Sequence, residues 1–226
     1  QCIYMSDVNN DGNTDIIAGN WGYNNKFWKD KTPPLRLYCG DFDNSGNQTQ
    51  LLSYVREGTE YPFYGKEQLE RKLPALKKKY LHNTDFAGTP FKEALGSFTK
   101  NTIPLEAERL GSSIFYGDGK GNFTMEYLPI NLQLAPICVI EKGSSSNDFF
   151  AGGNYYDLSP YEGRYESQSL AIFNINKNNT TRLMQNNLNA IQGQVKDLKW
   201  INSVTEGKIL IVARNNESLL FYKPAK

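Results

Sequence analysis

The chain has 226 residues and a formal net charge of +1, so charge gives it no bulk attraction to nucleic acid or to an anionic membrane. Hydrophobic residues make up 39% of the sequence and aromatic residues 13%, which supports a packed core and predicts a single domain over residues 1–226. No run of about 18 apolar residues is present, so we expect no membrane insertion by this segment. The three cysteines, Cys2, Cys39 and Cys138, are too few and too scattered for a disulfide framework.

Residue usage favours an all-β fold. Tyr (14) and Phe (12) are abundant beside 19 Gly. Aromatic rings suit a pleated, half-buried surface, and glycine supplies the positive φ of tight turns. The chain begins within an apolar run at residues 2–5 that has the character of a strand. We therefore expect a processed or truncated piece of a longer protein.

Two copies of a strand, an acidic loop and a second strand open the chain. The first copy occupies residues 2–5, 7–15 and 16–20, and the second occupies residues 35–40, 41–49 and 51–55. The second loop begins 34 residues after the first, and internal repeats at such spacings indicate propellers or solenoids. The sequence therefore predicts repeated β units.

Helical periodicity interrupts this pattern. Apolar side chains lie three and four residues apart at Leu69, Leu73, Leu76 and Tyr80. This spacing places them on one face of a helix. Pro74 either begins a second short helix in its first turn or kinks one longer helix. We predict an α-helical insertion at about residues 66–96.

Strand character then returns and continues to the end of the chain. A turn rich in Gly, Asp and Asn at residues 117–122 separates two apolar runs, which predicts a hairpin. The turn is not a phosphate-binding loop, because no helix and no GK[ST] ending follow it. The expected strands are 113–116, 123–127, 171–175, 195–200 and 208–213.

The first acidic loop has the spacing of a calcium site. Oxygen-bearing residues stand at its positions 1, 3, 5, 7 and 9: Asp7, Asn9, Asp11, Asn13 and Asp15. Asn13 would offer its backbone carbonyl. Ca²⁺ takes about six to eight hard oxygen ligands, and the glycine at position 6 permits the bend that lets alternate side chains converge on one point.

The residues of this loop also bear on other interpretations. An EF-hand would have Glu at position 12, where this chain has Ala18 inside an apolar strand. Zinc is disfavoured because no His or Cys lies nearby. Asp and Asn also form Asx turns between strands without any metal, and this alternative stays open. It is stronger for the second loop, where Asp41, Asp43 and Ser45 are followed by Thr49 at position 9.

The segments D-V-N-N-D-G-N-T-D-I-I-A-G-N and Y-G-D-G-K-G-N-F resemble FG-GAP/VCBS repeats, which form bladed β-propellers with a calcium loop at a hairpin. Together with G-G-N-Y-Y-D-L-S-P-Y-E-G-R-Y-E and I-V-A-R-N-N, they resemble the C-terminal part of exported VCBS-repeat proteins of Bacteroidetes-type bacteria. Those proteins are related in repeat type to the cartilage acidic protein 1 group. The resemblance covers most of the chain.

The resemblance implies a partial β-propeller of three to four blades, each a four-stranded antiparallel sheet. It implies Ca²⁺ in the first loop and a second set of ligands at Asp41, Asp43, Ser45 and Asn47. It also implies a secreted, periplasmic or cell-surface location. So few blades do not close a ring, so we expect self-association or completion by missing chain. The loop at 141–148 lacks the ligand spacing and is predicted to bind no metal.

One long loop is a candidate ligand site. It combines aromatic, acidic and basic side chains at Tyr155, Tyr156, Asp157, Tyr161, Arg164 and Glu166. Such side chains bind glycans or protein partners, and loops often carry function. Two alternatives stand beside this one: the tyrosines pack over the fold, or acids of residues 155–166 serve a polysaccharide-active lyase or glycoside hydrolase.

Nucleophilic catalysis has little support in the sequence. His82 is the single histidine, so a Ser/His/Asp or Cys/His arrangement has only one candidate base. It follows a lysine-rich helical stretch, where we expect it to be exposed. The sequence therefore favours a calcium-binding module that binds protein or glycan, with no evident catalytic activity.

Overall fold

A computed structural model describes residues 1–27, 35–143, 147–158, 162–168, 170–176, 181–184 and 191–223. The chain is mostly β, and its strands form four antiparallel sheets, as the composition predicts. Its contacts fall into two compact units. The first combines Gln1–Asn25 with Leu110–Lys226, and the second is Lys26–Arg109.

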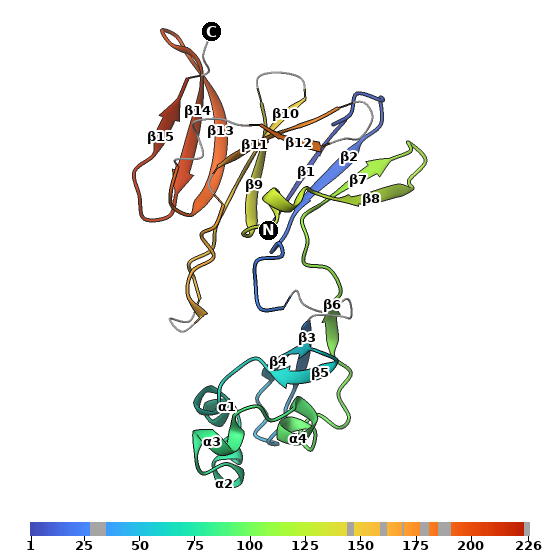
Figure 1. Ribbon diagram of the computed structural model, residues 1–226, viewed down its shortest axis with the longest axis vertical. Coiled ribbons are helices and arrows are strands. Elements are labelled where there is room, and N and C mark those ends of the chain that lie inside the picture. The colour runs from blue at the N-terminus through green and yellow to red at the C-terminus, as the bar shows by residue number, and fades with distance from the viewer. Residues whose placement is uncertain are drawn as a thin grey trace. The chain divides into compact units, whose positions relative to one another are not determined.

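The first unit contains three of the sheets (Figure 1). The first sheet has the order β1-β2-β7-β8 and consists of Cys2–Ser6, Asp15–Gly19, Ser113–Gly117 and Phe123–Tyr127. Neighbouring strands are antiparallel throughout. The sheet is therefore an up-and-down meander, and the whole second unit is inserted between β2 and β7.

The next two sheets are uninterrupted meanders. The second sheet has the order β12-β11-β10-β9 and contains β9 (Ile137–Lys142), β10 (Asp148–Gly153), β11 (Ala171–Ile175) and β12 (Thr181–Met184). The third contains β13 (Val195–Ser203), β14 (Gly207–Arg214) and β15 (Leu220–Tyr222). A short 3-10 helix, η1 (Ile130–Leu132), precedes β9.

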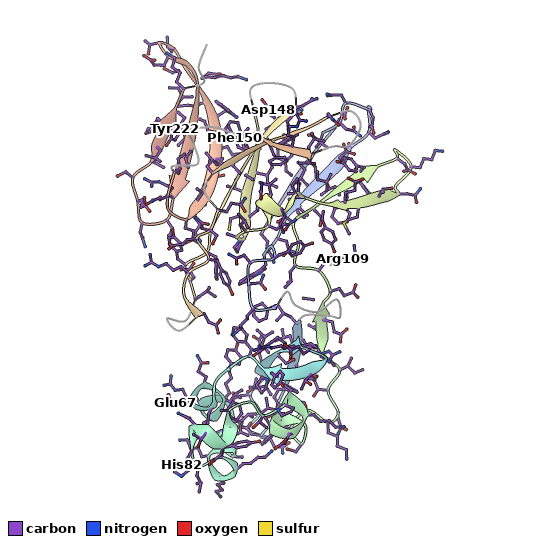
Figure 2. All side chains as sticks on the ribbon, in the orientation of Figure 1. Glu67, His82, Arg109, Asp148, Phe150 and Tyr222 are labelled. Atoms are coloured by element: carbon purple, nitrogen blue, oxygen red, sulfur yellow. The ribbon has the colours of Figure 1, made fainter. Side chains whose placement is uncertain are left out.

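The second sheet is buried on both faces. Successive side chains of a strand point to opposite faces, so Phe149 enters the core shared with the first sheet and Phe150 the core shared with the third. Trp200 of β13 donates from Nε1 to the carbonyl of Lys142 at 2.7 Å. Tyr222 packs against the same core as Phe150 (Figure 2). The three sheets thus pack face to face in chain order, and none closes on itself within the described residues.

The second unit is a small sheet packed with helices. Its sheet has the order β5-β4-β3-β6 and consists of Leu35–Gly40 (β3), Thr49–Arg56 (β4), Thr59–Pro62 (β5) and Leu105–Ala107 (β6). Four short helices follow β5: α1 (Lys66–Lys72), α2 (Leu76–Lys79), α3 (Asn83–Phe86) and α4 (Phe91–Leu95). These helices occupy the segment at 66–96 that the periodicity indicates.

The apolar face of the helices forms the core of this unit. All four side chains identified by their helical spacing are buried: Leu69, Leu73, Leu76 and Tyr80. α1 ends before Pro74 and α2 begins after it, because proline cannot continue the hydrogen bonding of the preceding helix. Tyr38 of β3 stacks on Phe91 of α4, with ring centroids 4.6 Å apart.

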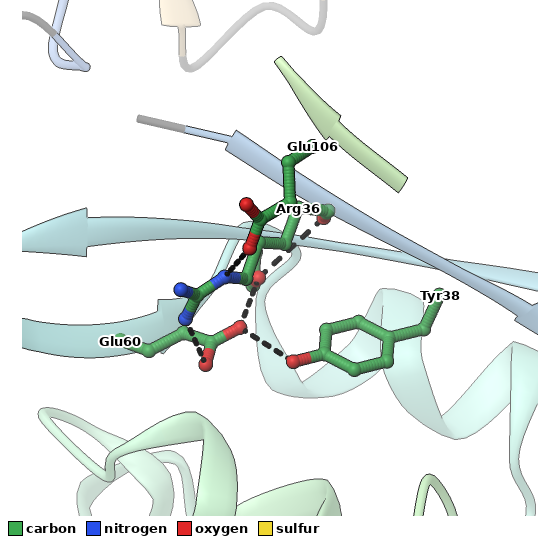
Figure 3. A network of polar contacts seen from close by, with 5 residues as sticks. Arg36, Tyr38, Glu60 and Glu106 are labelled. Atoms are coloured by element: carbon green, nitrogen blue, oxygen red, sulfur yellow. Dashed lines mark hydrogen bonds and ion pairs between the residues drawn. The ribbon is translucent and has the colours of Figure 1, made fainter. Parts of the chain in front are cut away.

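A polar network crosses the sheet of the second unit (Figure 3). Arg36 donates from Nε to Glu106 at 2.7 Å and from Nη1 to Glu60 at 3.1 Å. Tyr38 and the fully buried Ser53 also donate to Glu60, at 3.0 and 2.5 Å. Burial, with the Glu60 carboxylate next, raises the pKa of Tyr38 to about 12. The network joins residues of all four strands and pairs one guanidinium with two carboxylates.

Two features of the structure concern membrane insertion and the single histidine. Among the described residues, no helix has the length and apolar character needed to cross a bilayer. His82 precedes α3 and is exposed (Figure 2). Its backbone N–H donates to the Asp85 carboxylate at 2.9 Å, so this histidine takes part in capping a short helix.

Candidate functional site

The first acidic loop joins β1 to β2 and is shaped by its own side chains. Asp7 accepts the N–H of Asp11 on Oδ1 at 3.1 Å and the N–H of Gly12 on Oδ2 at 3.0 Å. The bend requires positive φ at two positions, Asn10 (60°) and Gly12 (90°). Glycine and asparagine tolerate this conformation better than other residues, which explains their places in the loop.

Alternate side chains continue this pattern through the loop. Asn9 accepts the Asp11 N–H at 3.1 Å and donates from Nδ2 to Asp11 Oδ2 at 2.9 Å. Asp11 Oδ1 accepts the N–H of Asn13 at 2.8 Å. The Asn13 N–H, together with the Asn9 side chain, lowers the pKa of Asp11. Asp11 is therefore an exposed, ionised carboxylate held in a fixed orientation.

Asp15 closes the loop and is fully buried. Its Oδ2 accepts the N–H of Val8 at 3.0 Å, and its Oδ1 accepts the N–H of Gly117 on β7 at 2.9 Å. In the described part of the chain, no Lys or Arg forms an ion pair with it. Burial of a charge without an opposite charge is costly, so this carboxylate is an unusual feature of the core.

The second loop, between β3 and β4, has the same geometry. Asp41 accepts the N–H of Ser45 on Oδ1 at 3.0 Å and that of Gly46 on Oδ2 at 2.8 Å. Asp43 accepts the Ser45 N–H at 3.2 Å. Positive φ again falls at positions 4 and 6, Asn44 (56°) and Gly46 (82°). The two loops are thus the same local structure, one in each compact unit.

The second loop differs where the sequence departs from the first. The Oγ of Ser45 stands where Asp11 has a carboxylate, and it accepts the N–H of Asn47 at 3.4 Å. Position 9 is Thr49, the first residue of β4, so no buried carboxylate closes this loop. Two carboxylates remain, against three in the first loop.

A third polar turn lies beside the first loop. Asp118, between β7 and β8, accepts the N–H groups of Lys120 at 2.8 Å and Asn122 at 3.0 Å. A methyl group added to Gly119 would collide with Oδ1 of Asn13, so the turn and the loop are in close contact. The sequence predicted this turn as a hairpin connection, but nothing in the local pattern placed it next to Asn13.

The donor set of the first loop has the chemistry that Ca²⁺ requires. Every candidate ligand is an oxygen, and a carboxylate oxygen that accepts one N–H keeps further acceptor capacity. Within the described residues, no three His, Cys, Asp or Glu side chains gather into a group that could hold a metal ion. Asp7, Asp11 and Asp15 instead each bond to backbone N–H groups. In the loop at 141–148, residues 144–146 lie outside the described residues.

The candidate ligand loop is pinned by two of its tyrosines. Tyr155 and Tyr165 pair as an isolated antiparallel bridge, with N–H to carbonyl distances of 2.8 and 3.0 Å. Both rings pack on Trp21, at centroid distances of 5.6 and 5.5 Å. Tyr155 therefore packs against the fold through Trp21, as one of the two alternatives to ligand binding predicts for the tyrosines of this loop.

The residues on either side of this pair line a cavity. These residues are Asn154, Tyr156, Arg164 and Glu166, each one position away from Tyr155 or Tyr165. They line a cavity of about 450 Å³ together with Gln192, Gly193 and Glu217. The Arg164 guanidinium lies 4.9 Å from the centre of the Tyr156 ring. Burial, with the Glu166 charge next, raises the pKa of Tyr156.

The remaining candidates of this loop lie elsewhere. Asp157 is exposed and its carboxylate is 3.7 Å from Nζ of Lys196; it does not line the cavity. Tyr161 lies outside the described residues. Glu217, which the sequence did not single out, comes from the turn after β14, and no local motif links it to residues 154–166.

Comparison of the chain with protein-family models, with curated proteins and with solved structures gave no match. The functional interpretation of the two acidic loops and of the cavity therefore depends on their own chemistry.

Proposed function

We propose that the protein is a calcium-binding, extracytoplasmic module with propeller-type blades, which binds a protein or a glycan and shows no evident catalytic activity. The first loop is the primary calcium site, with Asp7, Asn9, Asp11, Asn13 and Asp15 as its ligands. The second loop is a weaker site at Asp41, Asp43, Ser45 and Asn47.

The observation that carries this proposal is the first loop itself. Oxygen-bearing side chains alternate along a backbone bent by Asn10 and Gly12, and the loop ends in the buried carboxylate of Asp15, which forms no ion pair in the described part of the chain. A divalent cation would supply the missing positive charge. Recurrence of the loop geometry at Asp41 supports the same function there, with lower affinity because fewer carboxylates are present.

The blade interpretation is supported by the order of the sheets. In the first unit, each antiparallel meander packs on the next through its face, which is the arrangement that successive blades adopt. On this interpretation the unit contributes three blades, and the segment Lys26–Arg109 is an insertion within the first blade.

One observation favours a second candidate function, a polysaccharide-active enzyme. Two carboxylates, Glu166 and Glu217, line one cavity, and glycoside hydrolases act with a pair of carboxylates. Turnover of an oligosaccharide panel that disappears in Glu166→Gln would support the enzyme. Absence of turnover by the intact chain would leave the binding module.

Calcium binding is tested by calorimetric titration and by thermal unfolding. A ligand that binds only the folded state stabilises it by about 2.7 kcal/mol at a hundredfold excess over Kd, so the melting temperature should fall in EDTA and recover in excess Ca²⁺. The double variant Asp7→Asn, Asp11→Asn should lose the tighter binding event. The matched double variant Asp41→Asn, Asp43→Asn should keep it.

A further control separates a specific site from general charge effects. Asp197 is an exposed carboxylate on β13, outside both loops, and Asp197→Asn should leave the calcium response unchanged. If the intact chain gives neither binding heat nor a shift of the melting temperature at millimolar Ca²⁺, the calcium proposal is wrong.

A further inference from the structure

The cavity beside the paired tyrosines brings together charged side chains from distant parts of the chain. Tyr156, Arg164 and Glu166 come from one loop, and Glu217 comes from the turn between β14 and β15. The volume of about 450 Å³ falls within the range of roughly 300–1,000 Å³ that is typical of small-molecule sites. All four of these side chains carry polar groups, so a hydrogen-bonding ligand is favoured over an apolar one.

The Glu217 carboxylate is held in place by its surroundings. Arg214 forms an ion pair with it and donates from Nη1 to the carbonyl of Gln192 at 3.0 Å and from Nη2 to that of Ser218 at 3.2 Å. Gly193 has a φ of 102°, and a methyl group added there would lie 2.5 Å from Oε1 of Glu217. The glycine therefore leaves room for the carboxylate at the cavity wall.

Asn154, which lines the cavity, is joined to a second buried residue, Gln168, that does not line it. Asn154 is 2% exposed and has a φ of 72°. Its side chain donates from Nδ2 to the carbonyl of Gly193 at 2.9 Å and accepts the N–H of Gln168 on Oδ1 at 3.1 Å. Gln168 is 4% exposed, and among the described residues neither its amide nitrogen nor its amide oxygen has a hydrogen-bond partner. Buried polar groups are usually hydrogen-bonded, so the amide of Gln168 is an unusual feature beside a cavity-lining residue.

The charges of the lining side chains select the class of ligand. The carboxylates of Glu166 and Glu217 accept hydrogen bonds, and the guanidinium of Arg164 donates them. Neighbouring acceptors and donors of this kind match adjacent hydroxyl groups, each of which both donates and accepts. Arg214 pairs with Glu217, so two positive charges balance two negative ones, and a neutral ligand is favoured because an ionic one gains no net attraction.

We infer that this cavity binds a neutral sugar unit, with Glu166 and Glu217 accepting its hydroxyl protons and Arg164 donating to its oxygens. The inference rests on the proposed glycan-binding role, and it assigns that role a location in the structure and a class of ligand. It does not rest on calcium binding, because none of the acidic-loop residues lines the cavity.

The test is calorimetric titration of the full chain, in buffer containing Ca²⁺, with glucose, galactose, mannose, xylose and galacturonate. At least one neutral sugar should bind, and galacturonate should bind more weakly. Loss of a charge-assisted hydrogen bond in Glu166→Gln or Glu217→Gln should weaken binding at least tenfold. The matched control Asp157→Asn changes an exposed carboxylate of the same loop that does not line the cavity, so it should bind like the parent.

Several outcomes would overturn the inference. They are the absence of binding to every neutral sugar, a preference for galacturonate, and unchanged affinity in both glutamate variants. Thermal unfolding of each variant checks that it is folded. If Glu217→Gln is unstable because it loses the ion pair with Arg214, Glu166→Gln still tests the inference. Sugar binding without any calcium response would refute the calcium site and leave the cavity assignment intact. A calcium response without any sugar binding would refute the cavity assignment and leave the calcium site intact.

Discussion

Replacement of Asp15 by Asn separates the structural role of this carboxylate from a role as a metal ligand. Both of its oxygens accept backbone N–H groups, from Val8 at 3.0 Å and Gly117 at 2.9 Å. Asparagine keeps one acceptor oxygen and presents an NH₂ group to the other N–H. A buried donor left without a partner costs about 1–3 kcal/mol, so Asp15→Asn should lower the free energy of unfolding by that amount in EDTA.

Calcium should enlarge this loss if Asp15 is also a ligand. The parent chain would gain about 2.7 kcal/mol at a hundredfold excess of Ca²⁺ over Kd, and the variant would gain much less. Denaturant titration followed by tryptophan fluorescence measures both quantities, because Trp21 and Trp200 belong to the unit that contains Asp15.

Two results would refute parts of this reasoning. A loss below about 0.5 kcal/mol in EDTA, comparable to an ordinary surface substitution, would mean that the two backbone hydrogen bonds are not important to the hairpin. An equal loss with and without Ca²⁺ would mean that Asp15 has only a structural role. Asp197→Asn, which changes an exposed carboxylate on β13, is the matched control and should have little effect in either condition.

Two further predictions concern backbone conformation and alkaline pH. Gly12→Ala and Gly46→Ala should each lower the free energy of unfolding by about 1–2 kcal/mol, because their φ values of 90° and 82° disfavour any side chain although the space around them is open. Gly65→Ala, at a φ of −68°, is the control. Equal melting temperatures for all three variants would contradict this account. The pKa of Tyr38 is raised from 10.0 to about 12, so the stability that this phenol contributes is present below about pH 10 and is lost as the pH rises toward 12. Urea unfolding between about pH 9 and 12 should therefore show a smaller alkaline loss in Tyr38→Phe than in the parent, and an identical loss would show that Tyr38 does not contribute.

The sequence by itself determined the features that depend on neighbouring residues. The two acidic loops have their shared form because side chains at positions 1, 3 and 5 bond to N–H groups at most five residues away. The helices at 66–96 form where apolar residues recur at helical spacing, and α1 ends where Pro74 makes continuation costly. Local hydrogen bonds and periodicity need no knowledge of the rest of the fold.

Tertiary structure alone decided which distant residues meet. β2 pairs with β7 across the whole segment Lys26–Arg109, so the insertion extends well beyond the helices that periodicity identifies. The buried Asp15 accepts a hydrogen bond from Gly117, 102 positions later in the chain, and Glu217, from the turn after β14, lines the same cavity as Glu166. Such pairings depend on how much apolar surface the complete core buries, and that quantity belongs to no short segment of the sequence.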